Sequence, residues 1–264
     1  MKSKIVILFS FIFLVFGTIS AQKTWEKPMQ KWNKEDAIKI LNTSPWVQTY
    51  QSTEGMAAID KTEIAKTQND LRITTATNQN QVNGSTSRAL SVVPVIIRLH
   101  SALPIRQALV RLQQIDAGYD KMDEQKRTIF DNAMKNILDC PLCQNYYVIT
   151  MTKAVNSSRE NVEDGLFQSM KNEQLKGNVW LVNENGEKDE LEQFVPPKSA
   201  NDLALFFFKR KDANGNNFIG AEDKNFKFVF NNAFLTSSNP YATILPKSFE
   251  FKISGLVLNG NLIF

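Results

Sequence analysis

The chain of 264 residues is 42% hydrophobic and 22% charged, a composition that is ordinary for a globular protein and enough for one sizeable core. Its 31 Lys and Arg residues against 27 Asp and Glu give a formal charge of only +4. A nucleic-acid-binding protein needs a clustered basic face. The basic run at residues 209–211 abuts Asp212 and is more simply explained as the solvated end of a hairpin, so no nucleic-acid partner is predicted.

Residues 1–21 have the pattern of a secretory signal peptide. Two lysines form a basic start, the run from Ile5 to Phe16 is apolar apart from one serine, and small residues precede Gln22. Spanning a bilayer takes roughly 20 apolar residues, and this run is shorter. We therefore expect cleavage after Ala21, no transmembrane anchor in the mature chain, and a secreted or periplasmic location.

Residues 22–50 are predicted to form a tryptophan-rich helical segment. Asn33 is suited to cap a helix, and the acidic residues after it favour the positive end of a helix. The helix is expected to stop at Asn42, since Pro45 pushes the residue before it out of helical geometry. Three rings flank this helix, and they either dock the segment onto the main domain or form an aromatic platform for a ligand or partner. These rings are Trp25, Trp32 and Trp46.

Residues 51–90 differ in composition from the rest of the chain. They contain no aromatic residue and are rich in Thr, Gln, Asn and Ser. A long segment of this kind does not belong inside a compact domain. The prediction is a mostly flexible linker that separates the segment 22–50 from a globular domain at residues 91–264.

The front half of that domain is predicted to contain a strand, two helices and a second strand. Residues 95–99 alternate as in a half-buried strand, which places Arg98 and His100 on its solvent-facing side. Helices are expected over residues 101–115 and 123–138, and a weaker one over residues 157–177. The second helix is predicted to bury a stripe at helical spacing. This stripe consists of Phe130, Ala133, Met134, Ile137 and Leu138.

The remainder of the chain is predicted to be β structure. Asn185-Gly186 indicates a tight hairpin turn, and residues 203–209 and 225–230 are expected to pair as a second hairpin around a polar loop. Phe226, Phe228 and Phe230 recur at period two, which is typical of the core face of a strand. The fold class is therefore α+β, with a largely antiparallel sheet or sandwich in the C-terminal part packed by about three helices.

Several short stretches resemble a set of short exported bacterial proteins of uncharacterised function. They are WNKEDAIKILNTSPW near the N-terminus, SALPIRQAL after the predicted linker, a C-x-x-C followed by YYVI, and FKISGLVLNGNLIF at the end of the sequence. The resemblance covers scattered pieces of the chain, and Ser-Pro-Trp at residues 44–46 is its most specific element. It implies export and a shared fold but no activity, so it supplies no catalytic residue.

Cys140 and Cys143 are the two cysteines of the chain. A thioredoxin-type centre lies at the start of a helix, where amide dipoles stabilise a thiolate, whereas a helix is expected to end just before Cys140. A structural zinc site needs four ligands, and carboxylates or a second chain would have to complete it here. A structural disulfide in an oxidising compartment is the favoured interpretation. Thiol–disulfide exchange, zinc binding, reduced thiols and pairing with another chain remain alternatives.

Catalytic constellations are few in this sequence. His100 is the only histidine, so any hydrolase of the Ser-His-Asp or Cys-His type would have to use it, and Ser101 is better explained as a helix-start residue. A glycosidase needs only two acids. The candidate acids, which look like solvated surface, are Glu163 with Asp164, and Asp189 with Glu190 and Glu192. No catalytic residue is predicted, and an envelope enzyme, either a carboxylate-dependent hydrolase or a thiol–disulfide oxidoreductase, is the alternative function.

The polar loop at residues 212–223 partly matches a calcium-binding loop. Residues at its ligand positions are Asp212, Asn214, Asn216 and Asp223. Asn217 stands where glycine is expected, and the last ligand is Asp in place of a bidentate Glu, so a plain hairpin loop is favoured over calcium binding. No other metal or cofactor is predicted. The sequence thus predicts an exported, non-enzymatic binding or cell-envelope interaction protein, whose partner is another envelope protein or a surface ligand.

Overall fold

The computed structural model describes residues 23–51, 94–153, 167–168, 170–198, 202–231, 233, 247–258 and 261–264. The predicted signal peptide and nearly all of the predicted linker lie outside these ranges, as does most of the helix expected over residues 157–177.

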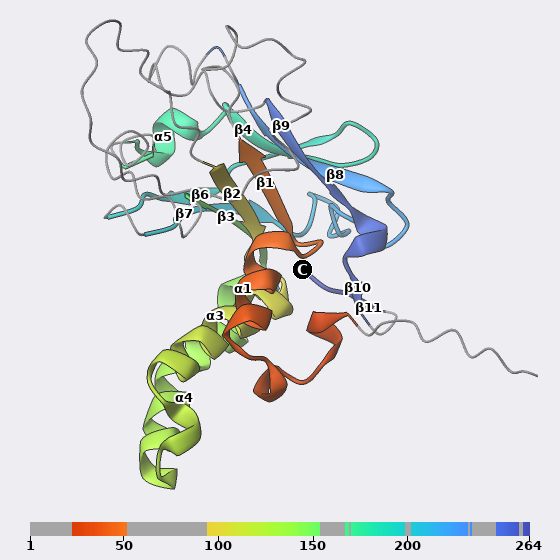
Figure 1. The fold of residues 1–264 in the computed structure, drawn as a ribbon. Coiled ribbons are helices and arrows are strands. Elements are labelled where there is room, and N and C mark those ends of the chain that lie inside the picture. The colour runs from red at the N-terminus through yellow and green to blue at the C-terminus, as the bar shows by residue number, and fades with distance from the viewer. Residues whose placement is uncertain are drawn as a thin grey trace, which may run out of the picture.

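The described strands form two antiparallel sheets and one short two-stranded ribbon (Figure 1). The five-stranded sheet contains, in spatial order, β1 (Val47–Gln51), β2 (Pro94–Leu99), β3 (Tyr146–Lys153), β7 (Ala204–Lys209) and β6 (Gln193–Val195). The four-stranded sheet contains β5 (Lys188–Glu190), β4 (Val179–Val182), β8 (Asn225–Phe230) and β9 (Ser248–Lys252). The ribbon joins β10 (Val257–Leu258) to β11 (Asn261–Leu262).

Three of the four described α-helices lie together at one end of the sheets (Figure 1). These are α1 (Lys34–Thr43), α3 (Leu103–Asp116) and α4 (Glu124–Asp139), and the fourth is the single turn α5 (Asn172–Leu175). Short 3-10 turns are η1 (Thr24–Glu26), η2 (Met29–Lys31), η3 (Tyr119–Lys121), η4 (Pro141–Gln144) and η6 (Ile253–Gly255). The predicted α+β class with mostly antiparallel sheets is confirmed.

The first helix begins where its sequence predicts. The side chain of Asn33 accepts the backbone N–H of Asp36 at 2.7 Å, and the Asp36 carboxylate accepts the N–H of Asn33 at 3.4 Å. Each bond satisfies a donor that the first helical turn leaves unpaired. At the other end of the helix, the buried Arg98 donates from Nε to the carbonyl of Leu41 at 2.6 Å. The guanidinium of a neighbouring strand thus completes the last turn of α1.

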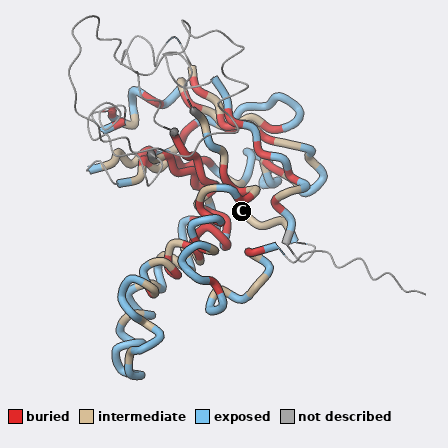
Figure 2. Tube along the Cα trace, viewed as in Figure 1, coloured by how far each residue is buried: buried red, intermediate tan, exposed pale blue. Residues whose placement is uncertain are grey.

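Buried residues gather between the two sheets (Figure 2), and many of them are phenylalanines. The rings of Phe206 on β7 and Phe228 on β8 meet across the interface with centroids 5.2 Å apart. Phe226, Phe228 and Phe230 are all buried, as their period of two predicts, and Phe226 stacks on Phe251 of β9 with centroids 5.1 Å apart. Burial of large rings is a major favourable contribution to folding, so this layer holds the two sheets together.

The hairpin predicted from residues 203–209 and 225–230 is wrong. β7 pairs with β3 and β6 in the five-stranded sheet, whereas β8 pairs with β4 and β9 in the other sheet. The residues between them carry the chain from one sheet to the other. The alternating pattern identified both strands and their core faces, but it contains no information about which strand each one pairs with.

The half-buried character predicted for β2 is also wrong, because both of its faces are covered. Ile97 and Leu99 point into the inter-sheet core, and Ile96 and Arg98 on the opposite face are buried as well. β2 is an inner strand because β1, from the N-terminal segment, pairs with it in the register Val47↔Arg98. The segment at residues 23–51 therefore adds a strand to the same sheet as the rest of the chain.

Candidate functional site

The three tryptophans of the N-terminal segment face inward. Trp32 and Trp46 are fully buried, and Trp25 is half-buried with its ring edge-on to Trp46 at 5.6 Å. Nε1 of Trp46 donates to the carbonyl of Ile263 at 2.7 Å, and Nε1 of Trp32 donates to the carbonyl of Lys27 at 3.0 Å. The bond of Trp46 attaches the segment to the C-terminal part of the chain, whereas that of Trp32 lies within the segment. Because both rings are buried, neither Trp32 nor Trp46 presents a flat aromatic platform to a ligand.

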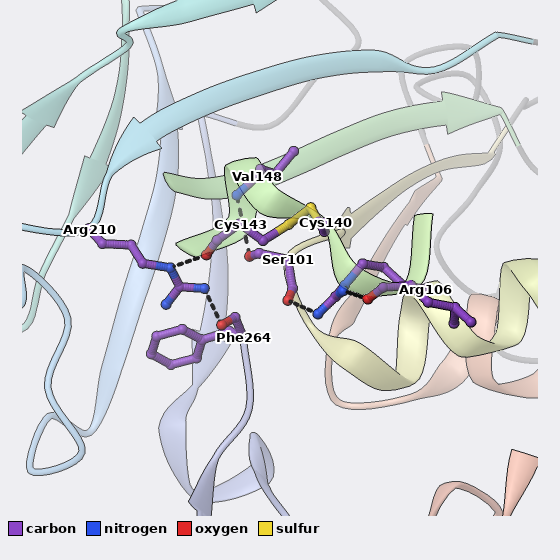
Figure 3. Close-up of a disulfide and its surroundings, with 8 residues drawn as sticks. Ser101, Arg106, Cys140, Cys143, Val148, Arg210 and Phe264 are labelled. Atoms are coloured by element: carbon purple, nitrogen blue, oxygen red, sulfur yellow. Dashed lines mark hydrogen bonds between the residues drawn. A yellow bond between two sulfur atoms is a disulfide. The ribbon is translucent and has the colours of Figure 1, made fainter. Parts of the chain in front are cut away.

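Cys140 and Cys143 form a disulfide at the junction between α4 and β3 (Figure 3). Cys140 follows the last residue of α4 in a left-handed conformation, with φ of 42°, and Cys143 lies in the turn η4. The disulfide predicted from the spacing is present, and it lies where a helix ends. Cys143 is buried against Val148 and Phe207, while Cys140 is half-buried.

Two arginines bind the main chain on either side of this disulfide (Figure 3). Arg106 of α3 donates to the carbonyl of Leu138 in the last turn of α4 and, at 3.4 Å, to that of Ser101. Arg210 donates from Nε to the carbonyl of Cys143 at 2.6 Å and from its terminal nitrogen to the carbonyl of Phe264. Burial lowers the pKa of both guanidiniums, each of which is enclosed by protein. The arrangement fixes the turn that carries the disulfide.

His100 is half-buried close to Arg106 and Arg98, so the predicted solvent-facing position is wrong. Its Nδ1 is buried and has no hydrogen-bond partner among the described residues. Burial, together with the charges of Arg106 and Arg98, lowers the pKa of the imidazole to about 4. Ser101 Oγ accepts the backbone N–H of Val148 at 3.3 Å. His100 and Ser101 therefore pack at this junction. They are not hydrogen-bonded to each other as a nucleophile and its base would be.

The structure separates the three acids at the end of the β4–β5 hairpin. Asp189 points into the space between the sheets, Glu190 is exposed on the other face of β5, and Glu192 forms an ion pair with Lys209 at 3.0 Å. Burial raises the pKa of Asp189 to about 6, and the negative charges of Glu192 and Glu190 add to this effect. Asp189 is thus not the solvated surface group predicted from the sequence. The other candidate pair, Glu163 and Asp164, lies outside the described residues.

The loop considered for calcium uses its acidic side chains to close turns. Asp212 accepts the backbone N–H groups of Asn214 and Asn216, both at 2.8 Å, and Gly215 between them has φ of 82°. Asp223 accepts the N–H of Gly220 at 2.8 Å. The N–H of Asn216 is the main cause of the lowered pKa of Asp212. These hydrogen bonds show that Asp212 and Asp223 close turns, and calcium binding by this loop stays the less favoured alternative of the sequence analysis.

The least buried element with an apolar stripe is α4, which projects from the body of the molecule (Figures 1 and 2). None of its 16 residues is buried, so the burial predicted for its stripe is wrong. Phe130 packs edge-on against Tyr119 with centroids 5.4 Å apart, and the guanidinium of Arg127 lies 5.5 Å from the Tyr119 centroid. Ile129 has 63% of its surface exposed. Helical periodicity identified the stripe but gave no sign of how few elements cover it.

None of the helices in the described ranges is both long and apolar enough to cross a bilayer. Across those same ranges, no three His, Cys, Asp or Glu side chains gather closely enough to hold a metal ion. In comparisons with known proteins, no family model, no curated protein and no solved structure matches this chain.

Proposed function

We propose that the chain is an exported, non-enzymatic interaction protein of the cell envelope or its surroundings, and that it binds a partner protein through α4. The leader pattern at residues 1–21 supports export. The Cys140–Cys143 disulfide is of a kind that persists in oxidising compartments. The observation that carries the binding role is the projecting α4 with its uncovered apolar residues.

A single exposed apolar side chain is ordinary on a protein surface, but α4 carries several along one helix. Ile129 is largely exposed, and Phe130, Met134, Ile137 and Leu138 are only half-buried against α3 and η3. Leu142, in the turn just beyond the helix, has 53% of its surface exposed. An apolar surface of this type fits a partner that lays a helix or a groove along α4.

Site-specific photo-crosslinking tests this proposal. A photoreactive amino acid at Ile129 is expected to give a discrete crosslinked species in cells that produce the protein, because this position faces outward on the apolar side of α4. The same probe at Lys135, which is exposed on the charged side of the helix, is the matched control and is expected to give at least several-fold less product. Equal crosslinking at the two positions, or none at either, would refute a docking role for this face.

The variant Ile129→Glu provides a second, independent measurement. It is expected to abolish the crosslink formed from a probe at Ala133 while changing the stability by no more than about 0.5 kcal/mol, as is usual for an exposed position. Lys135→Glu should leave that crosslink intact. Circular dichroism melts of both variants separate a lost interaction from a lost fold.

A further inference from the structure

The helix α3 begins without a side chain that caps its N-terminus. Its N-cap residue is Ala102, which makes no capping hydrogen bond, and Pro104 in the first turn has no N–H group. The hydroxyl of Ser101, just before the cap, already accepts the backbone N–H of Val148 at 3.3 Å. No described residue accepts the N–H of Leu103. The positive end of this 14-residue helix is therefore not compensated by its own segment.

The side chain of Arg106 folds back over this N-terminus and brings an unpaired donor to it (Figure 3). Arg106 is only 8% exposed. Its terminal nitrogens donate to the carbonyl of Leu138 and, at 3.4 Å, to that of Ser101, which immediately precedes the N-cap. Nε is buried, and no described residue accepts its hydrogen. Because a buried N–H group without an acceptor is costly, this position calls for an acceptor from outside the described residues.

His100 supplies a second unpaired nitrogen beside the same N-terminus. Its Nδ1 atom is buried and has no hydrogen-bond partner in the part of the chain that the structure describes. This atom carries a hydrogen in the charged imidazole and in one of the two neutral tautomers. The ring as a whole is only half-buried, and Leu103 at the start of the helix has 38% of its surface exposed. The N-terminus of α3 can therefore be reached from solvent.

Positive charge gathers at this junction with little acid to balance it. Arg98, Arg106 and Arg210 donate to neutral carbonyl or amide oxygens. Within the described ranges, none of the three forms an ion pair. The charge of Arg210 acts on Arg106, and the exposed carboxylate of Asp139 acts on it in the opposite sense. Buried charges are normally paired, so these surroundings favour an anion.

We infer that the N-terminus of α3 is a binding site for a phosphate-type oxyanion, held by Arg106 Nε, His100 Nδ1 and the N–H of Leu103. A helix N-terminus with free N–H groups is suited to such an anion. The terminal nitrogens of Arg106 are already engaged with two carbonyls, so the bidentate grip that suits a planar carboxylate is not available. Three single donors from separate groups suit the oxygens of a tetrahedral ion. The inference does not depend on the proposed docking of a partner on α4.

His100 provides a direct readout, because it is the only histidine of the chain and its imidazole gives a single NMR signal. Sodium phosphate added to the untagged protein at fixed pH and ionic strength is expected to shift this signal saturably. Bound phosphate should also raise the midpoint of the imidazole titration, since a nearby anion favours the charged ring. Sodium sulfate should compete with phosphate, whereas acetate and chloride should give no saturable shift. Absence of saturation with both phosphate and sulfate would overturn the site.

Glycerol phosphate distinguishes the two sources of such a group. Binding at least as tight as that of inorganic phosphate would assign the site to a phosphorylated organic ligand. Much weaker binding would assign it to the free ion, because the site would then not admit a substituent on the phosphate.

A matched pair of variants at the exposed Leu103 separates the site from the fold. Leu103→Glu places a negative charge at the first helical position, which the helix dipole favours, so α3 should stay folded. Phosphate affinity should nevertheless fall on the order of tenfold, because a like charge then lies beside the bound anion. Leu103→Gln has a similar shape without the charge and should bind phosphate as the parent does. Equal affinity in all three proteins would show that phosphate binds elsewhere and would refute this assignment.

Discussion

At the residue scale, buried and half-buried guanidiniums donate to main-chain carbonyls where segments of the chain meet. Arg98 binds the end of α1, Arg106 the end of α4, and Arg210 the turn after it. Arg111, also buried, donates to the carbonyl of Trp32 at 2.9 Å and binds Asp120 through two nitrogens. The last carbonyls of a helix lack partners within it, and the guanidinium has several donors in a fixed geometry. Arginine therefore suits these junctions better than lysine.

The half-buried His100 makes stability depend on pH in the opposite sense to Asp189. Its pKa is lowered from 6.5 to about 4 by burial and by the neighbouring Arg106 and Arg98. As the pH falls from about 6.5 to 4, the unfolded chain takes up a proton that the folded chain refuses, so stability is lost over this window. His100→Gln is expected to reduce that loss by at most about 3 kcal/mol, since each pKa unit corresponds to about 1.4 kcal/mol.

Urea unfolding at pH 7.5 and pH 4.5 measures the effect of His100→Gln. Asp189→Asn is the matched comparison, because it should change the same pH profile in the opposite direction. If His100→Gln destabilised the protein equally at both pH values, the imidazole would be a packing group whose ionisation is not suppressed by folding.

At the element scale, local signals in the sequence were reliable and long-range ones were not. The Asn33 cap and the turn at Gly186 both depend on neighbouring residues, and both are present. The disulfide also follows from a short spacing. By contrast, the partners of β7 and β8 depend on how the sheets associate, and the same alternation is compatible with either arrangement.

The residues of the candidate site also show that local sequence patterns do not reveal which distant element covers a side chain. Arg98 and Asp189 look like solvent-facing residues because they are charged, yet both point into covered space. The last turn of α1 covers Arg98, and β7 lies against the strand that carries Asp189. Neither neighbour is adjacent in sequence. The apolar stripe of α4 led to the opposite error, since an amphipathic pattern indicates a face that can be buried and not whether a partner element exists.

The disulfide is expected to stabilise the junction between α4 and β3 without being required for folding. The ring it closes is very short, and the loop-entropy relation assigns such a ring only about 2 kcal/mol. The double variant Cys140→Ser/Cys143→Ser should therefore fold and melt roughly 4–8 °C lower than the parent. The parent treated with a reductant should melt at the same temperature as the variant. Failure of the variant to fold would mean that the disulfide, in place of Arg106 and Arg210, holds this turn.

At the scale of the whole molecule, segments from both ends of the described chain converge on the helical end of the sheets. Trp46, which precedes β1, donates to the carbonyl of Ile263, and Arg210 binds the carbonyl of Phe264. Lys34 at the start of α1 pairs with Asp116 at the end of α3 at 2.9 Å. The bonds of Trp46 and Lys34 join the N-terminal segment to residues 217 and 82 positions away in the sequence. The segment should therefore unfold together with the sheets.

The phenylalanine layer predicts that the two sheets unfold in one transition. Phe228 contacts Phe206 and Phe208 of the other sheet as well as Phe230 and Phe249 of its own, so its ring belongs equally to both sheets. Phe228→Ala should cost roughly 3–5 kcal/mol, the range for a large buried ring. Val229→Ala, on the half-exposed outer face of the same strand, is the control and should cost far less.

Denaturant unfolding of Phe228→Ala, followed by both tryptophan fluorescence and circular dichroism, decides whether the sheets are coupled. Trp46 reports on the helical end beside β1, and Trp180 lies on β4 of the other sheet, so coincident transitions mean that both sheets lose structure together. The variant should shift both signals to lower denaturant by the same amount. Two separated transitions, with only the second sheet weakened, would show that the sheets are independently stable and that the ring contacts between them contribute little.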